Sequence, residues 1–124
     1  MKVLIIDDDA DIRLVAGLSL RRLGGMEVVE AASGADALAI AASHAGPIAL
    51  LVTDLVMPGL QGYQLAEQLA AARPELRVLY VSGFTENSMI HHGVPDHGVA
   101  FLAKPFSTDA LGEAVRRVLD GQAG

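Results

Sequence analysis

The sequence predicts a single-domain α/β protein in which an open parallel β-sheet is covered by helices on both faces. Short apolar runs alternate along the chain with amphipathic segments, and this alternation is typical of repeated strand–helix units. Four of the apolar runs are continuous and lack a polar residue at every second position, which indicates strands buried on both faces. Right-handed crossovers then place the connecting helices on both sides of the sheet.

Five strands are expected, each followed by a helical segment. The four continuous apolar runs are the buried strands and cover residues 3–6, 49–52, 78–81 and 99–102. The segment 26–31 carries Glu27 and Glu30, and two charged side chains in so short a strand suit the edge of a sheet.

Two of the expected helices have clear amphipathic patterns. One runs from residue 11 to about residue 23 and is ended by the pair Gly24-Gly25. Its predicted inner face consists of Ile12, Val15, Ala16, Ser19 and Leu23. The last helix begins at a cap formed by Ser107 or Thr108. Its predicted inner face consists of Leu111, Ala114, Val115, Val118 and Leu119.

The remaining helices are less sharply patterned. Alanine-rich helices are expected over residues 33–42 and about 63–72, the second ended by Pro74. Residues 86–92 are expected to form a short or irregular helix, because glycine and proline follow them closely.

Length and composition narrow the function classes. The chain has 124 residues, 52% of them hydrophobic, which suits one globular domain over residues 1–121 with a short tail at 122–124. The absence of cysteine excludes disulfides, thiol catalysis and cysteine-bound zinc. A net charge of −6 without a large basic cluster argues against nucleic-acid binding. Neither a signal peptide nor a membrane-spanning stretch is recognisable, so we expect a cytoplasmic protein without membrane contact.

Polar residues stand at the ends of four apolar runs: Asp7, Asp54, Ser82 and Lys104. The carboxyl ends of parallel strands converge on one crevice, where ligands bind. A carboxylate cluster, a hydroxyl and an amine are therefore expected to meet there. This set of groups suits a divalent metal ion and a phosphoryl group.

The acids Asp7, Asp8 and Asp9 are adjacent, and charges ~4 Å apart repel by about 4 kcal/mol per pair at an effective dielectric constant of ~20. A bound Mg²⁺ would remove this cost, although a solvated loop can also tolerate it. Alternate side chains point oppositely, so we expect Asp7 and Asp8 to face the crevice and Asp9 to turn outward. Asp54 beside a metal could act as a nucleophile and form an aspartyl phosphate, with Lys104 pairing first with Asp54 and then with the phosphate.

Three other motifs do not support a functional site. The series Asp7-x-Asp9-x-Asp11 imitates a calcium loop but has Ile12 where that loop needs glycine. The sequence around Ser82 lacks the first glycine of a nucleophile elbow. A group of loop histidines has no recognisable partner ligands and is interpreted as surface: His91, His92 and His97.

Four motifs in a fixed order carry a family resemblance. They are the pair Asp7-Asp8, the loop DLVMPGLQG starting at Asp54, the pair Ser82-Gly83, and Lys104-Pro105-Phe106. Over essentially its whole length, the chain closely resembles the receiver domain of two-component response regulators. The resemblance implies a flavodoxin-like (βα)5 sandwich of three layers, with a five-stranded parallel sheet in the order 2-1-3-4-5.

The resemblance also implies roles for individual residues. Asp54 would be the phosphoacceptor, Asp8 would bind Mg²⁺ directly, and Asp7 would act through water. The remaining implied roles are the metal-binding carbonyl of Val56, the phosphoryl-binding groups of Ser82, Gly83 and Lys104, the switch pair Ser82 and Phe101, and a cis peptide bond before Pro105.

By resemblance, the protein is a signalling switch in a phosphorelay and catalyses only its own phosphorylation and dephosphorylation. Its phosphoryl donor would be a histidine kinase or a histidine phosphotransfer protein, and Mn²⁺ could replace Mg²⁺. The surface formed by the fourth helix, fifth strand and fifth helix would change on phosphorylation and could form a homodimer. The segment from residue 73 to 111 also resembles receivers of hybrid sensor kinases.

Two rival functions remain open at this point. A haloacid-dehalogenase-type phosphatase would use Asp7-x-Asp9 as its signature, although the chain is short for that fold and Ala10 replaces the usual Thr or Val. A degenerate receiver would bind partners without taking phosphate. Many turnovers of a small phosphate ester would indicate the phosphatase, one labile phosphate per chain the receiver, and none the degenerate module.

Overall fold

A single parallel sheet organises the protein. The computed structural model describes residues 2–44, 46–54, 62–82, 100–104 and 106–120. Its five strands are β1 (Lys2–Ile6), β2 (Glu27–Ala31), β3 (Leu50–Asp54), β4 (Arg77–Ser82) and β5 (Ala100–Ala103). They lie in the order β2-β1-β3-β4-β5, and every pair is parallel. The predicted sheet and its order are confirmed, including the edge position of the strand that carries two glutamates.

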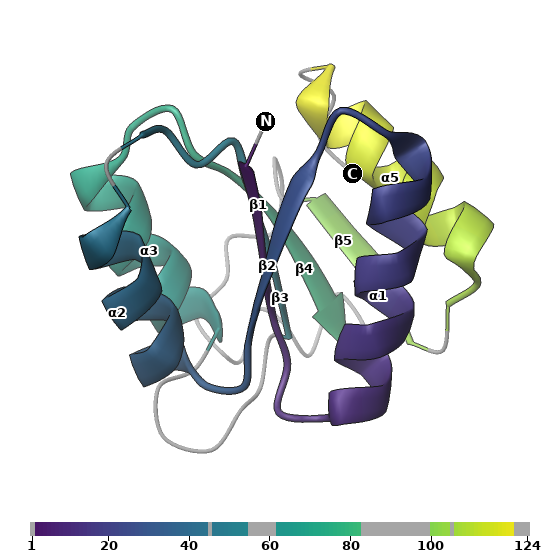
Figure 1. The fold of residues 1–124 in the computed structure, drawn as a ribbon, viewed down its shortest axis with the longest axis horizontal. Coiled ribbons are helices and arrows are strands. Elements are labelled where there is room, and N and C mark those ends of the chain that lie inside the picture. The colour runs from purple at the N-terminus through teal and green to yellow at the C-terminus, as the bar shows by residue number, and fades with distance from the viewer. Residues whose placement is uncertain (1, 45, 55–61, 83–99, 105, 121–124) are drawn as a thin grey trace.

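Helices cover both faces of this sheet, as predicted. The described helices are α1 (Ala10–Leu23), α2 (Gly34–Ser43), α3 (Gly62–Ala72) and α5 (Thr108–Leu119). In Figure 1, α1 and α5 lie on one side of the strands and α2 and α3 on the other. The helix expected over residues 86–92 lies outside the described residues. Among the described helices, none combines the length and apolar character needed to cross a bilayer.

Local side-chain hydrogen bonds set the starts of the helices. Asp9 caps α1 through bonds from the backbone N–H groups of Asp11 and Ile12. Ser33 caps α2 in the same way. For α5 the sequence left two candidates, and the cap is Ser107, whose hydroxyl oxygen accepts the N–H of Ala110 at 3.0 Å.

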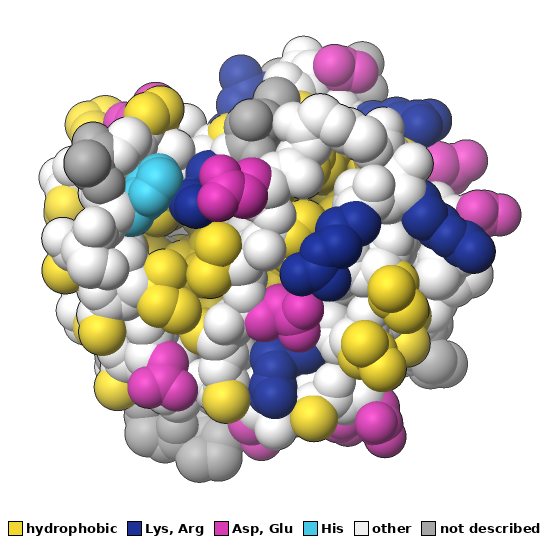
Figure 2. All heavy atoms as spheres, viewed as in Figure 1, with side chains coloured by type: hydrophobic (Ala, Val, Ile, Leu, Met, Phe, Trp, Pro, Cys, Tyr) yellow, Lys and Arg dark blue, Asp and Glu magenta, His cyan; other side chains and the backbone are white. Residues whose placement is uncertain are grey.

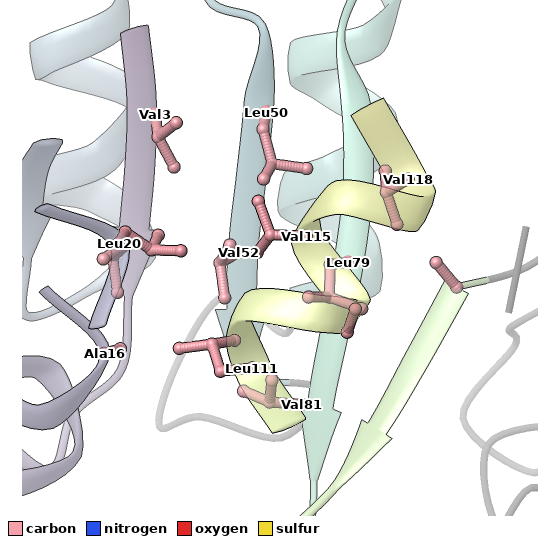
Figure 3. Packing of buried hydrophobic residues seen from close by; sticks show 13 residues of the cluster. Val3, Ala16, Leu20, Leu50, Val52, Leu79, Val81, Leu111, Val115 and Val118 are labelled. Carbon is pink, nitrogen blue, oxygen red and sulfur yellow. The ribbon is translucent and has the colours of Figure 1, made fainter. Parts of the chain in front are cut away.

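The core consists of two apolar layers, one on each face of the sheet. On the α1/α5 face, side chains of the central strands point toward those of α5 and α1, as Figure 3 shows. The labelled strand residues are Val3, Leu50, Val52, Leu79 and Val81, and the labelled helix residues are Ala16, Leu20, Leu111, Val115 and Val118. Burial on both faces explains why these strands read as continuous apolar runs.

The predicted inner face of α1 was partly wrong. Val15 is 39% exposed, whereas Leu20, which the prediction left out, is fully buried. The cause is that apolar residues surround most of α1, so periodicity alone cannot select its inner side. Packing against both the sheet and α5 makes the selection and leaves Leu14 and Leu18 in solvent.

Candidate functional site

Acidic side chains meet where β1 and β3 end. Asp7 directly follows β1, and Asp54 is the last residue of β3. Each of Asp7, Asp8 and Asp54 places a carboxylate oxygen within 4.8 Å of the others. We call these three residues the carboxylate cluster. The parallel pairing of β1 with β3 brings Asp7 and Asp54 together across a wide sequence gap.

Lys104 closes the cluster from the end of β5. Its Nζ donates to Asp7 Oδ2 at 2.7 Å and to Asp54 Oδ2 at 3.2 Å. Partial burial by itself lowers the pKa of Lys104. The hydrogen bond that Lys104 donates to Asp7 and the charges of Asp54 and Asp7 together outweigh the effect of burial, so the pKa of Lys104 is raised above its ordinary value. Lys104 therefore stays positively charged at neutral pH.

Asp7 is the most constrained member of the cluster. Its side chain is 2% exposed, and both of its carboxylate oxygens accept hydrogen bonds. Oδ2 accepts from Lys104, and Oδ1 accepts the backbone N–H of Asp9 at 2.9 Å. Satisfied hydrogen bonds and a paired cation are what allow a carboxylate to be buried. The Asp7 side chain thus helps to fix the shape of residues 7–9, which we call the acidic loop.

The side chains of Asp8 and Asp9 point in different directions, as the alternation of side chains predicted. Asp8 is exposed and belongs to the carboxylate cluster. Asp9 turns outward, and its Oδ1 accepts hydrogen bonds from the backbone N–H groups of Asp11 and Ile12 at the start of α1. The phosphatase alternative needs Asp7 and Asp9 in one site, and the capping role of Asp9 argues against it.

Other predicted site residues lie nearby or fall outside the described part of the chain. Ser82 ends β4, and its backbone pairs in register with Ala103, the residue before Lys104. Phe101 pairs in register with Tyr80 and packs against the apolar layer on the α2/α3 face. Three predicted site residues lie outside the described residues: Val56, Gly83 and Pro105.

One residue at the site, Arg13, was not expected from the sequence. The Arg13 Nη1 donates to the backbone carbonyl of Asp7 at 2.6 Å, from one turn inside α1. The signal that could have revealed it is a lone basic side chain four residues after the cap Asp9, in an otherwise acidic segment. A residue at that position of the first turn lies beside the loop that precedes the helix.

The residues of the cluster fit a hard divalent cation. Mg²⁺ and Mn²⁺ prefer carboxylate oxygens and water. Three carboxylates lie within reach of one ion, and Lys104 is bonded to two of them, those of Asp7 and Asp54. The remaining negative charge would be compensated by a bound divalent ion. The chemistry of the donor set therefore supports a metal site here.

The sequence model of a known family covers most of the chain. It is described as the response regulator receiver domain and matches residues 3–116. Among characterised proteins, the sensor kinase CckA of Brucella abortus is 33% identical over 120 residues, covering 97% of this chain and 13% of that protein. The chemotaxis protein CheY of Pseudomonas aeruginosa is 31% identical over 122 residues, covering 97% of both.

Solved structures agree with the sequence match. The receiver domain of the hybrid histidine kinase CckA superposes with a TM-score of 0.77 at 35% identity, covering 96% of this chain and 99% of that one. The chain spans only part of several relatives. Besides CckA, it covers 24% of the transcriptional regulator DctD of Rhizobium meliloti and 57% of the activator ExaE of Pseudomonas putida.

Proposed function

Because this chain belongs to the family of response regulator receiver domains, we propose that it is a phosphorylation-controlled switch that accepts a phosphoryl group on Asp54. The observation that carries the proposal is the setting of Asp54. Its carboxylate ends a central strand, accepts a hydrogen bond from Lys104 at 3.2 Å, and lies in the carboxylate cluster with Asp7 and Asp8. A nucleophile, a cation and a metal-binding acid pair are what phosphoryl transfer to a carboxylate requires.

The donor is proposed to be a phosphohistidine on a histidine kinase or a phosphotransfer protein. A carboxylate oxygen of Asp54 attacks phosphorus, the new O–P bond forms, and the N–P bond to the imidazole breaks. The imidazole nitrogen keeps the electron pair and takes a proton from solvent. Lys104 moves its charge from the free carboxylate toward the phosphoryl oxygens, where negative charge grows. The same site would later expose the acyl phosphate to water, so the chain catalyses only its own modification and its reversal.

The metal-binding residues are proposed to be Asp8 and Asp54, with Asp7 acting through water and with the carbonyl of Val56 as a further ligand. The carboxylate of Asp7 already accepts hydrogen bonds on both oxygens, which supports its indirect role. When bound, Mg²⁺ or Mn²⁺ would withdraw negative charge from the phosphoryl oxygens.

Magnesium should stabilise the fold without any partner. Millimolar Mg²⁺ is expected to raise the melting temperature, because an ion that binds only the folded state stabilises it by mass action. The variant Asp8→Asn should lose this rise, since it removes an exposed cluster carboxylate. Asp11→Asn, which removes the same charge outside the cluster, should keep it. Thermal unfolding with and without Mg²⁺ measures both, and an unchanged wild-type curve would contradict the metal site.

Signal output is proposed to follow from the switch pair Ser82 and Phe101. Both lie on strands next to the site, and Phe101 packs against the apolar layer on the α2/α3 face. We propose that the hydroxyl of Ser82 and the backbone of Gly83 contact the phosphoryl group and that Phe101 then repacks. The face that includes β5 and α5 would change and could pair with a second copy. Residues 1–121 would form the whole switch, in the cytoplasm.

A protein donor needs a docking surface beside Asp54, and α1 offers one. Leu14, Val15 and Leu18 are 55%, 39% and 52% exposed, and they are the large hydrophobic residues exposed among the described part of the chain. At 1.5 Å per residue, they lie ~8–14 Å along the helix from its cap Asp9, which borders the site. Figure 2 shows hydrophobic side chains over α1, with acidic groups toward its N-terminal end. We propose that an apolar helix face of the donor covers them.

Leu18→Gln should separate docking from chemistry. Glutamine keeps the helix propensity of leucine but cannot replace apolar burial, which is worth about 1.5–3 kcal/mol for a leucine. We expect transfer from an autophosphorylated histidine kinase to slow by roughly tenfold or more. Labelling by acetyl phosphate should be unchanged, because that donor needs no surface. The control Ala39→Gln on α2 should affect neither rate, and equal slowing with both donors would contradict the docking role.

A further inference from the structure

We propose that Arg13 is a positioning residue for the carboxylate cluster and holds the acidic loop in the shape that turns Asp8 toward Asp54. The inference rests on the proposed metal site, which it deepens by naming what preorganises it. Arg13 is not one of the residues of the carboxylate cluster and would not bind the ion itself. Its effect would reach the metal ion through the backbone of the loop.

The Arg13 side chain holds the acidic loop at one point, because its guanidinium Nη1 donates to the carbonyl of Asp7 at 2.6 Å. The backbone N–H of Arg13 donates to the carbonyl of Asp9 at 3.1 Å, which is the i→i−4 bond that any residue at this position of α1 would make. The residue between these two carbonyls is Asp8. The helix itself therefore holds the loop after the exposed acid that is proposed to bind the ion directly, and the Arg13 side chain holds it before that acid.

The bond from the Arg13 side chain to a backbone carbonyl is informative because several carboxylates lie near Arg13 in sequence. Asp7, Asp8, Asp9 and Asp11 all lie within six residues of Arg13 in sequence. A guanidinium that served only to neutralise charge would be expected on a carboxylate, where its bonds are strongest. Among the described residues, the side-chain hydrogen bond of Arg13 instead goes to the uncharged Asp7 carbonyl. This choice points to a role in fixing backbone geometry.

Fixing that carbonyl constrains Asp8. The peptide between Asp7 and Asp8 is planar, so holding its C=O also sets the direction of its N–H and of the Asp8 Cα. The side chain of Asp7 is held independently by Lys104 and the N–H of Asp9. Asp8 is exposed and lies between Asp7 and Asp9, which these bonds hold in place. Without Arg13, its carboxylate would sample more directions before meeting an ion.

The direction in which Arg13→Met changes the affinity for Mg²⁺ tests the proposal. In Arg13→Met the positive charge near the cluster disappears, so a purely electrostatic role predicts tighter Mg²⁺ binding. A positioning role predicts weaker binding, and groups that orient metal ligands typically contribute ~10–100-fold in affinity. We expect the Mg²⁺ dissociation constant from isothermal titration calorimetry to rise by about tenfold. An unchanged or lower dissociation constant would overturn the proposal.

Matched variants isolate the cause. Arg22→Met removes the same charge from the exposed end of α1 and should leave the dissociation constant unchanged within about twofold. Arg13→Lys keeps a positive donor near the carbonyl and should recover part of the affinity, which also serves if Arg13→Met fails to fold. At saturating Mg²⁺, labelling of Arg13→Met by acetyl phosphate should approach the wild-type level. Wild-type protein that binds no Mg²⁺ would instead overturn the metal site itself, a different result from normal wild-type binding with no effect of Arg13.

Discussion

Asp54→Asn is expected to abolish phosphorylation of this chain. The wild type should take one phosphate from acetyl phosphate or from a phosphorylated histidine kinase, and hydroxylamine should remove it, as it does any acyl phosphate. Asparagine has nearly the same shape but a neutral amide, which is not a nucleophile toward phosphorus. Because the Asp54 side chain is 13% exposed and bonded to Lys104, a near-isosteric replacement should leave the fold intact.

Intact mass and radiolabel counting would measure the stoichiometry. Asp9→Asn is the control, since Asp9 faces outward and asparagine is also a good helix cap. It should be labelled like the wild type. Labelling of Asp54→Asn to the same extent would refute the assigned phosphoacceptor. Repeated turnover of a small ester would support the phosphatase alternative, and a wild type without label would indicate a degenerate receiver.

Lys104→Met is expected to have the largest effect on stability. It leaves the buried carboxylate of Asp7 next to Asp54 without the cation that both contact at 2.7 and 3.2 Å. Removing one partner of a buried ion pair typically costs 3–5 kcal/mol, and the 19% exposure of Lys104 suggests about 3 kcal/mol here. Urea unfolding without metal would measure the loss. Some labelling of Asp54 should survive, but the surface change should no longer follow it.

Two comparisons identify the cause of that loss. Adding Asp7→Asn to Lys104→Met should restore part of the stability, because the unpaired buried charge is then gone. Mg²⁺ should stabilise Lys104→Met more than the wild type, since the competing ammonium is absent. If Lys104→Met proved as stable as the wild type, the bridge would have no structural role.

The pH dependence of the Lys104 contribution has a definite sign. The pKa of Lys104 is raised in the folded protein by its hydrogen bond to Asp7 and by the charges of Asp54 and Asp7, which together exceed the opposing effect of burial. Its contribution should therefore be complete below the pKa of an unfolded lysine, about 10.4, and lost as pH rises through the higher folded pKa. The stability difference between wild type and Lys104→Met should shrink in that alkaline range.

Much of the architecture was determined by the sequence alone. Continuous apolar runs placed the strands because a parallel sheet is buried on both faces, and the two glutamates of residues 26–31 marked the edge. The last helix begins at Ser107, one of the two caps that the sequence offered, and α2 begins next to residue 33, where a helix was expected. The gathering of Asp7, Asp54 and Lys104 also followed from topology, because each stands at the carboxyl end of its strand.

Tertiary structure decided which partner each of these groups takes. Lys104 could pair with any nearby acid, and its 2.7 Å bond to Asp7, 97 residues away along the chain, depends on the register of the strands between them. The inner face of α1 was decided by packing, because its apolar residues surround the helix and only contact with the sheet and α5 selects a side. The bond of Arg13 to the Asp7 carbonyl likewise depends on how α1 leaves its cap. Local pattern places the elements, whereas the choice among competing partners depends on distances that exist only after the elements have packed.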